Sequence, residues 1–239
     1  MALGLAAAVP GGAQETIASD RPGIGSASVV VAPGVLQAEF GTAWAGGPGP
    51  DALAIGQLLV RYGIAGVELE FLGNSWVNSR GEGANGADGF EDAAVGVKVP
   101  VARGIGDRAD LSLQGLLTVP TGSEGLGSDE WIPTVVALAD VALGEAAALG
   151  VNLGFSKGSG AVEDQVTASV TPSVGLTASL SAYAGWAGSF VDGTQSDWLE
   201  AGLAYLSGPD LQLDLNGAIS PDTDRWFVGV GMAVRTGSR

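Results

Sequence analysis

The chain has 239 residues, including 40 Gly, and is 46% hydrophobic but only 15% charged, which favours a Gly-rich β fold over a disordered chain or a helical globule. It contains no Cys and no His, so disulfides, thiolate metal sites and the His-dependent hydrolase and zinc chemistries are excluded. The net charge of -16 and the dispersed 10 basic residues argue against binding to phosphate backbones. We therefore predict no nucleic-acid partner, no cofactor, no metal site and no enzymatic activity.

The N-terminal stretch MALGLAAAVPGGAQE is typical of the end of a secretory signal, with small residues Gly11 and Ala13 before a candidate cleavage site at Gln14. We predict a partial signal peptide over residues 1–13, the alternative being a disordered start in a cytosolic protein. Residues 14–34 are then predicted to form a periplasmic N-terminal segment, and residues 35–236 a single barrel domain. No later window holds about 18 consecutive apolar residues, so any membrane crossing would use strands.

Segments of period-two alternation recur along the chain, separated by clusters of Gly, Pro, Asp, Asn and Ser. In the first segment Leu36 and Phe40 face one side, while Gln37 and Glu39 face the other. The pattern predicts about twelve strands, an even number that is typical of closed antiparallel outer-membrane barrels: 35–44, 53–62, 66–72, 93–100, 109–119, 131–142, 147–155, 166–174, 176–187, 198–206, 211–219 and 226–234.

The connectors between these strands alternate in length. Those at 63–65, 144–146, 174–175 and 207–210 are tight, whereas those at 73–89, 120–130, 156–164 and 188–196 are longer. Outer-membrane barrels have short turns on the periplasmic side and long loops outside, so both termini are predicted to be periplasmic and the acidic loops to face the exterior. Aromatic residues near strand ends are compatible with girdles at the membrane interfaces: Trp44, Trp131, Trp186, Trp198, Tyr205 and Trp226.

Charged residues fall inside otherwise apolar strands, as in LQLDLNGAISPDTDRWFVGVGMAVR, residues 211–235. In a membrane barrel such charges must point into the interior. The alternative is a soluble β-sandwich with its apolar face inside, which is disfavoured because the opposite face is mostly Gly, Ala, Ser and Thr rather than large polar residues. We predict that the following residues line the lumen: Glu39, Arg61, Glu68, Glu70, Lys98, Asp110, Asp140, Glu200, Asp214 and Arg235.

A series of short blocks resembles the phenol-degradation MetA-pathway family of transporters. The blocks are DRP (20–22), PG (33–34), LQAE (36–39), LLVRYGI (58–64), GFED (89–92), GVK (96–98), VPTG (119–122), QLD (212–214) and DRWFVG (224–229). The resemblance spans residues 16–236 and implies a Gram-negative outer-membrane barrel that passes small molecules. The chain departs from the pattern at its end, where Val234, Arg235 and Thr236 stand in place of a closing aromatic residue.

These patterns predict an outer-membrane channel or transporter for small molecules with a narrow charged lumen, and the resemblance implies hydrophobic or aromatic compounds among them. About twelve strands lie between side-chain-filled eight-stranded barrels and open sixteen-stranded porins, and the excess of acidic lumen residues would favour cations. Three alternatives stay open: the charges form a structural ion-pair network; the barrel is non-conducting, with acidic loops that bind divalent cations or bridge lipopolysaccharide; or the chain is a soluble binding module. Outer-membrane lipid, lipopolysaccharide and a small-molecule solute are the expected partners, and the sequence leaves the oligomeric state open.

Overall fold

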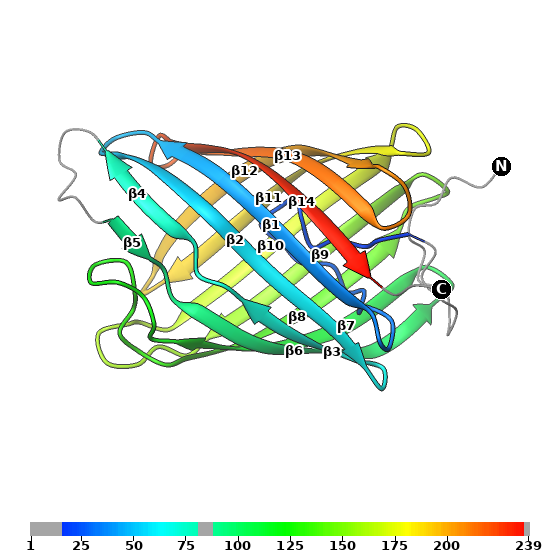
Figure 1. Ribbon diagram of the computed structural model, residues 1–239, viewed down its shortest axis with the longest axis horizontal. Helices are drawn as coiled ribbons and strands as arrows, with labels where there is room; N and C mark the ends of the chain where they lie inside the picture. Colours follow the sequence, from blue (N-terminus) through cyan, green and yellow to red (C-terminus); the bar gives the residue numbers. More distant parts are fainter. Residues whose placement is uncertain (1–15, 81–87, 237–239) are drawn as a thin grey trace.

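The chain forms one closed antiparallel sheet in a computed structural model that describes residues 16–80 and 88–236. Each strand pairs with its neighbours around the barrel, and β1 pairs with both β2 and β14, which closes the sheet (Figure 1). The strands are β1 Leu36–Gly46, β2 Asp51–Ile64, β3 Val67–Leu72, β4 Trp76–Arg80, β5 Asp88–Phe90, β6 Ala93–Ile105, β7 Ala109–Val119, β8 Ile132–Ala142, β9 Ala147–Ser156, β10 Gln165–Gly175, β11 Leu180–Val191, β12 Thr194–Leu206, β13 Leu211–Ser220 and β14 Arg225–Thr236.

These fourteen strands make twelve barrel positions, because two of the positions are interrupted. Both β3 and β4 pair with β2, one after the other, and so occupy a single position. In the next position β5 pairs with β4, and β6 pairs with β3. The predicted closed barrel of twelve strands is confirmed. The predicted loop at 73–89 is wrong in extent, since β4 and the first residues of β5 continue the barrel wall there.

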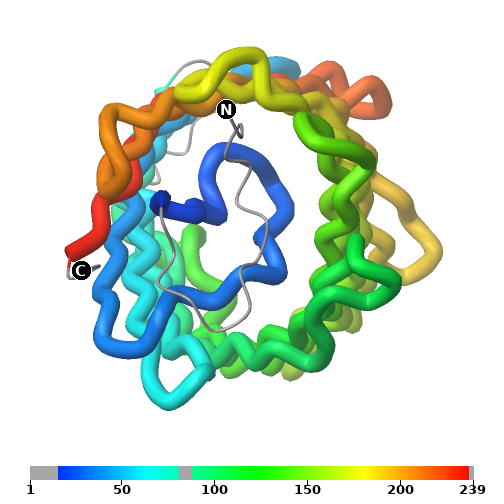
Figure 2. Tube along the Cα trace, turned by 90° about the vertical axis from the view of Figure 1, so that its right-hand side faces the viewer, coloured from blue at the N-terminus to red at the C-terminus, as the bar shows by residue number. Residues whose placement is uncertain are grey.

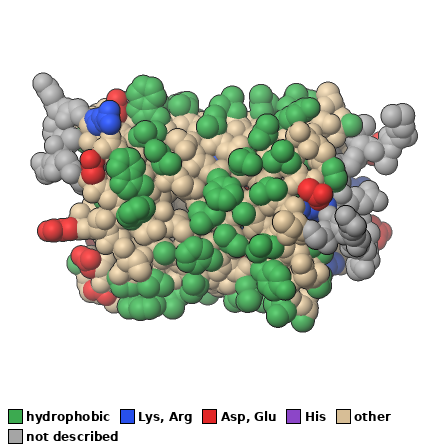
Figure 3. Space-filling model, in the orientation of Figure 1, with side chains coloured by type: hydrophobic (Ala, Val, Ile, Leu, Met, Phe, Trp, Pro, Cys, Tyr) green, Lys and Arg blue, Asp and Glu red, His purple; other side chains and the backbone are tan. Residues whose placement is uncertain are grey.

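The apolar face of the strands points outward. Leu213, Leu215, Val228 and Val230 are all exposed, and Val230 has 56% of its surface accessible. In the space-filling view, hydrophobic side chains are spread over the visible wall of the barrel, and the charged side chains that can be seen lie near its two ends (Figure 3). The alternative of a soluble sandwich with a dry apolar core is therefore wrong. No helix in the described part of the chain is long and apolar enough to cross a membrane.

The two ends of the barrel differ. One end, here called the termini end, carries residues 16 and 236 and the turns after β2, β6, β8, β10 and β12, and the other is called the loop end (Figure 1). The predicted long loop at 188–196 is wrong: β11 and β12 are joined by Asp192 and Gly193 alone, with φ of 45° and 76°. Positive φ at both positions is the requirement of a type I′ hairpin turn, for which Asp-Gly is a preferred pair. The tight turn predicted at 174–175 lies at 176–179 instead.

The aromatic residues near strand ends divide between the two faces. Trp44, Trp131 and Tyr205 are exposed on the outside, and Trp44 packs edge-on against Trp226 with ring centroids 5.7 Å apart. Trp198 does not belong to an outer girdle, because it pairs with buried Ala187 and lines an internal cavity.

The first described residues lie inside the barrel. Seen along the barrel axis, the N-terminal segment before β1 occupies the space enclosed by the strands (Figure 2). Residues 16–35, here called the luminal segment, include the described part of the region 14–34 that the sequence assigns to the periplasm. The predicted signal peptide at 1–13 lies outside the described residues, and the membrane side that the termini end faces stays a prediction.

Candidate functional site in the barrel lumen

The luminal segment is fixed at both of its ends near the termini end of the barrel. At its start, Ile17 is buried, and its backbone N–H donates to the Pro209 carbonyl oxygen at 2.7 Å. At its end, Val31 and Val35 are buried, and the Gly34 N–H donates to the Gly63 carbonyl oxygen at 2.9 Å. The residues between these anchors are therefore held inside the lumen as a closed loop.

Arg61 of β2 is the centre of a buried charge network. Its guanidinium binds Glu68 through two nitrogens, with Nε–Oε1 at 2.8 Å and Nη2–Oε2 at 3.0 Å. It also donates to Glu39 at 3.1 Å and to the backbone carbonyls of Ala18 and Val29, both at 2.8 Å. Arg61, Glu39 and Glu68 have no accessible surface. A guanidinium presents planar donors that match a carboxylate. Through these bonds and those to the two backbone carbonyls, Arg61 joins two barrel strands and both halves of the luminal segment.

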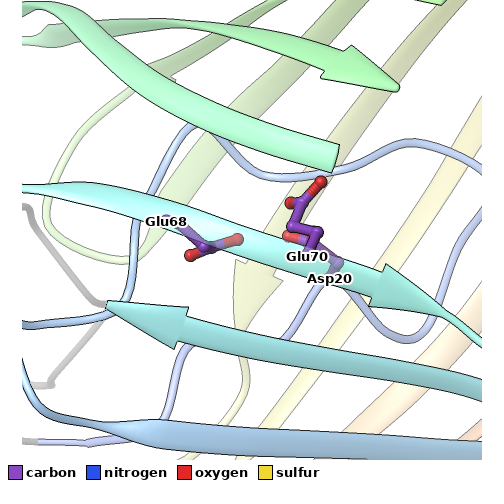
Figure 4. A group of neighbouring side chains, drawn as sticks. All are labelled: Asp20, Glu68 and Glu70. Carbon is purple, nitrogen blue, oxygen red and sulfur yellow. The ribbon is translucent and has the colours of Figure 1, made fainter. Parts of the chain in front are cut away.

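Lys98 of β6 occupies the centre of three carboxylates. Asp20, Glu68 and Glu70 bring their oxygens within 4.8 Å of one another, a spacing that could hold a metal ion (Figure 4). The Lys98 Nζ lies 2.8 Å from Asp20, 3.5 Å from Glu68 and 3.4 Å from Glu70. The ammonium group thus stands where a cation would bind, and the donor set is better described as an ion-pair network than as a metal centre.

A second ion pair fixes the luminal segment to the opposite side of β1. Arg21 donates to both Asp214 oxygens of β13, at 3.3 and 3.1 Å, and to Gln57 of β2 at 3.2 Å. Its guanidinium lies over Gly41 and Gly231, where any Cβ atom would overlap it. These two glycines, on paired positions of β1 and β14, leave the room that the Arg21 side chain needs.

Two further carboxylates bind the segment through its backbone rather than through a cation. Glu200 of β12 accepts from the Ile24 N–H at 2.9 Å, and Asp140 of β8 accepts from the Ser28 N–H at 2.6 Å. Between them, the Asn152 side chain of β9 makes paired hydrogen bonds with Ser26, at 2.7 and 2.9 Å. The tip of the segment is therefore hydrogen-bonded to the wall opposite the Arg61 network.

Most of the ten sequence-predicted residues are thus brought together around one segment. The ion pair between Arg61 and Glu68 is fully buried. Asp110 and Arg235 lie apart from the network: Asp110 is 3.6 Å from Arg103, and Arg235 is 2.8 Å from Asp210 and 3.1 Å from the Thr16 carbonyl oxygen. Sequence reasoning missed Asp20 and Arg21, because alternation marks only residues in strands. Both residues stand in the DRP block, which was the one available signal.

The luminal segment leaves part of the interior unfilled. A cavity of about 360 Å³ lies between residues 24–26 and the inner faces of β7 to β12. Its lining contains no charged side chain, whereas the network around Arg61 occupies the opposite wall. The interior is thus divided into an ionic side that binds the segment and an uncharged side that stays open.

The closed sheet, the outward apolar surface and the ionic interior define a transmembrane β-barrel of the bacterial outer membrane. The chain belongs to the family described as "Putative MetA-pathway of phenol degradation", whose model matches residues 19–236. This confirms the family indicated by the sequence blocks.

Solved structures of low sequence identity share the fold. The COG4313 outer membrane channel from Pseudomonas putida F1 is 14% identical, with a TM-score of 0.73 over 90% of this chain and 99% of that one. The NanC porin is 9% identical, with a TM-score of 0.60 over 82% and 98% of the two chains. A KdgM porin in complex with disordered oligogalacturonate is 9% identical, with a TM-score of 0.59 over 83% and 98%. A search of curated proteins finds no match.

Proposed function

We propose that the protein is an outer-membrane channel that passes small molecules through a narrow lumen lined in part by charged residues. The observation that carries this proposal is the open cavity of about 360 Å³ inside a closed barrel whose inner face is polar. A barrel needed only as a scaffold could fill its interior with side chains, as eight-stranded barrels do. The channel and porin names of the similar structures agree with transport rather than catalysis.

The orientation proposed with this function places the termini end in the periplasm. Every connector at that end has four residues or fewer, whereas the longer connectors 120–131 and 157–164 lie at the other end, which agrees with the usual arrangement of outer-membrane barrels. Connectors at the loop end carry the carboxylates of Asp92, Glu130, Asp164 and Asp222, which would then face the exterior and the lipopolysaccharide layer.

The direct test is planar-bilayer recording of the refolded full chain, together with swelling of liposomes in small sugars. We expect a small conductance, because the luminal segment occupies part of the cross-section. We also expect a preference for cations, since seven of the ten sequence-predicted lumen residues are acidic and three are basic. The absence of both conductance and swelling would contradict the channel.

A non-conducting structural barrel is the second candidate. It is favoured by the density of hydrogen bonds between the luminal segment and the wall, from Ile17 at one anchor to Val35 at the other. The two candidates differ in the effect of deleting the gene. A channel predicts slower uptake of a small solute, whereas a structural barrel predicts a weakened outer membrane with unchanged uptake.

A further inference from the structure

Glu200 of β12 is a buried carboxylate, 4% exposed, that forms no ion pair with a described residue. Its Oε2 atom accepts from the Ile24 N–H at 2.9 Å and from the Tyr183 hydroxyl at 3.4 Å. Its Oε1 atom is buried and has no hydrogen-bond partner in the described part of the chain, although the Thr171 side chain is near enough to interact with the carboxylate. Because a buried charge without a partner is costly, this oxygen indicates a ligand.

A second buried acceptor lies diagonally across the neighbouring strand. Asn216 of β13 pairs with Gly202, which is two residues after Glu200 and on the same face of β12. Long side chains at such diagonal positions are within reach of one another. The Asn216 Oδ1 atom is also buried, and it too lacks a hydrogen-bond partner among the residues that the structure describes. Two neighbouring acceptors without donors require an electropositive species that both can bind.

Glycines leave the space that these side chains occupy. A Cβ atom at Gly202 would overlap the Tyr183 ring, so the absence of a side chain there lets the ring lie across β12 with its hydroxyl near Glu200. Gly229 of β14 pairs with Asn216, and a Cβ atom at this position would overlap the Asn216 Oδ1 atom. The room for the carboxylate, amide and hydroxyl oxygens therefore results from residue choice at paired positions.

The carboxylate borders the open part of the interior. Trp198, the preceding inward residue of β12, lines the cavity of about 360 Å³. Ile24 lines the same cavity, and its backbone N–H is the group that binds the Glu200 Oε2 atom. Glu200 is thus next to the space through which a solute would pass, and it does not belong to the network around Arg61.

From this arrangement we infer that Glu200 and Asn216 form a transit site for a monovalent cation, Na⁺ or K⁺, in the lumen. Glu200 supplies the negative charge, and Asn216, Tyr183 and Thr171 supply neutral oxygens. Carboxylate, carbonyl and hydroxyl oxygens are ligands for hard cations. A single carboxylate matches a single positive charge, whereas Ca²⁺ sites use several acidic ligands. This inference rests on the proposed channel function and names the residues that select its cation.

The test is sodium-23 NMR of the full chain folded in detergent, because binding to the protein broadens the resonance of Na⁺. Glu200→Gln removes the charge but keeps the size of the side chain and an acceptor for the Ile24 N–H. Glu145→Gln is the matched control, because it makes the same change at an exposed residue of the connector between β8 and β9. Heat-dependent gel mobility verifies that each variant folds.

We expect saturable broadening with the wild type and with Glu145→Gln, its reversal by K⁺, and its loss in Glu200→Gln. Asn216→Asp adds a second carboxylate, so Ca²⁺ should displace Na⁺ from this variant at a lower concentration than from the wild type. Equal broadening by the wild type and Glu200→Gln would overturn the site, because Glu200 would then be neutralised by a proton rather than by a metal cation.

Bilayer recording of the same variants separates this outcome from the proposed function. In a KCl gradient, Glu200→Gln should shift the reversal potential towards zero, and Glu145→Gln should leave it unchanged. Conductance without Na⁺ binding that depends on Glu200 leaves the channel and removes the site. Na⁺ binding that depends on Glu200 but occurs without conductance leaves the ion site and contradicts the channel.

Discussion

Replacing Arg61 with Met should destabilise the barrel more than any substitution of a surface charge. Four carboxylates, those of Asp20, Glu39, Glu68 and Glu70, lie within 4.0 Å of Arg61 or Lys98. The substitution leaves them with one cation and removes five hydrogen bonds. Breaking a buried ion pair by removing one partner costs about 3–5 kcal/mol. We expect a loss of that size in the free energy of unfolding.

Urea unfolding in lipid vesicles, followed by fluorescence, measures this loss as a shift in midpoint at constant slope. The control is Lys157→Met, which breaks an ion pair of similar length, 2.9 Å to Asp164, in which both side chains are exposed. Exposed pairs of this kind contribute little. If Arg61→Met and Lys157→Met shift the midpoint equally, the network around Arg61 is not excluded from water, and its burial does not strengthen its ion pairs.

Three further predictions concern the loops, the luminal segment and the outer wall. Burial tends to raise the pKa of Asp92, but hydrogen bonds from Ser128, Gly122 and Thr121 outweigh it and lower the pKa. The stability lost in Asp92→Asn should therefore be constant above about pH 5 and decrease as the pH falls from about 4 through the lowered pKa of the folded state. Gly63→Ala places a Cβ atom against the carbonyl oxygens of Ala32 and Val31; we expect a loss of about 1–3 kcal/mol by urea titration and a larger conductance as the segment is displaced. Val230→Arg should cost about 2–4 kcal/mol in the same titration, because position 230 faces the acyl chains.

Each of these predictions has its own control. A stability difference for Asp92→Asn that does not change between pH 6 and pH 3 would mean that its carboxylate holds no charge-dependent bonds. For Gly63→Ala the control is Gly115→Ala, whose Cβ would meet only Val97 at 3.9 Å; equal effects would show that the segment does not pack against Gly63. If Val230→Arg left the free energy of unfolding unchanged, position 230 would lie outside the membrane.

Alternation of apolar and polar residues along the strands was enough to predict the barrel and which face of each strand points outward. Leu213 and Asp214 are adjacent, and one faces out while the other faces in, because a strand has a side-chain period of two. The same rule identified the inward carboxylates and cations. The sequence analysis missed the Asp192-Gly193 turn, although that dipeptide favours a two-residue hairpin.

The luminal segment could not be predicted in the same way. Residues 16–35 form no regular strand, and their position depends on long-range partners such as Asp214 for Arg21 and Lys98 for Asp20. Periodicity says nothing of contacts between a loop and distant strands. Trp198 was misplaced for a related reason: proximity to a strand end suggested an interface, but its register opposite Ala187 places it inside.

The most direct test is to measure which residues of β13 face the lipid and which face the lumen, because every proposal above requires apolar residues outside and polar residues inside. The chain has no Cys, so single cysteines at positions 212 to 216 can be spin-labelled without removing native ones. In lipid vesicles, labels at 213 and 215 should collide with dissolved oxygen, whereas labels at 212, 214 and 216 should be shielded from it. Oxygen accessibility that peaks at 212, 214 and 216 would contradict the barrel described here.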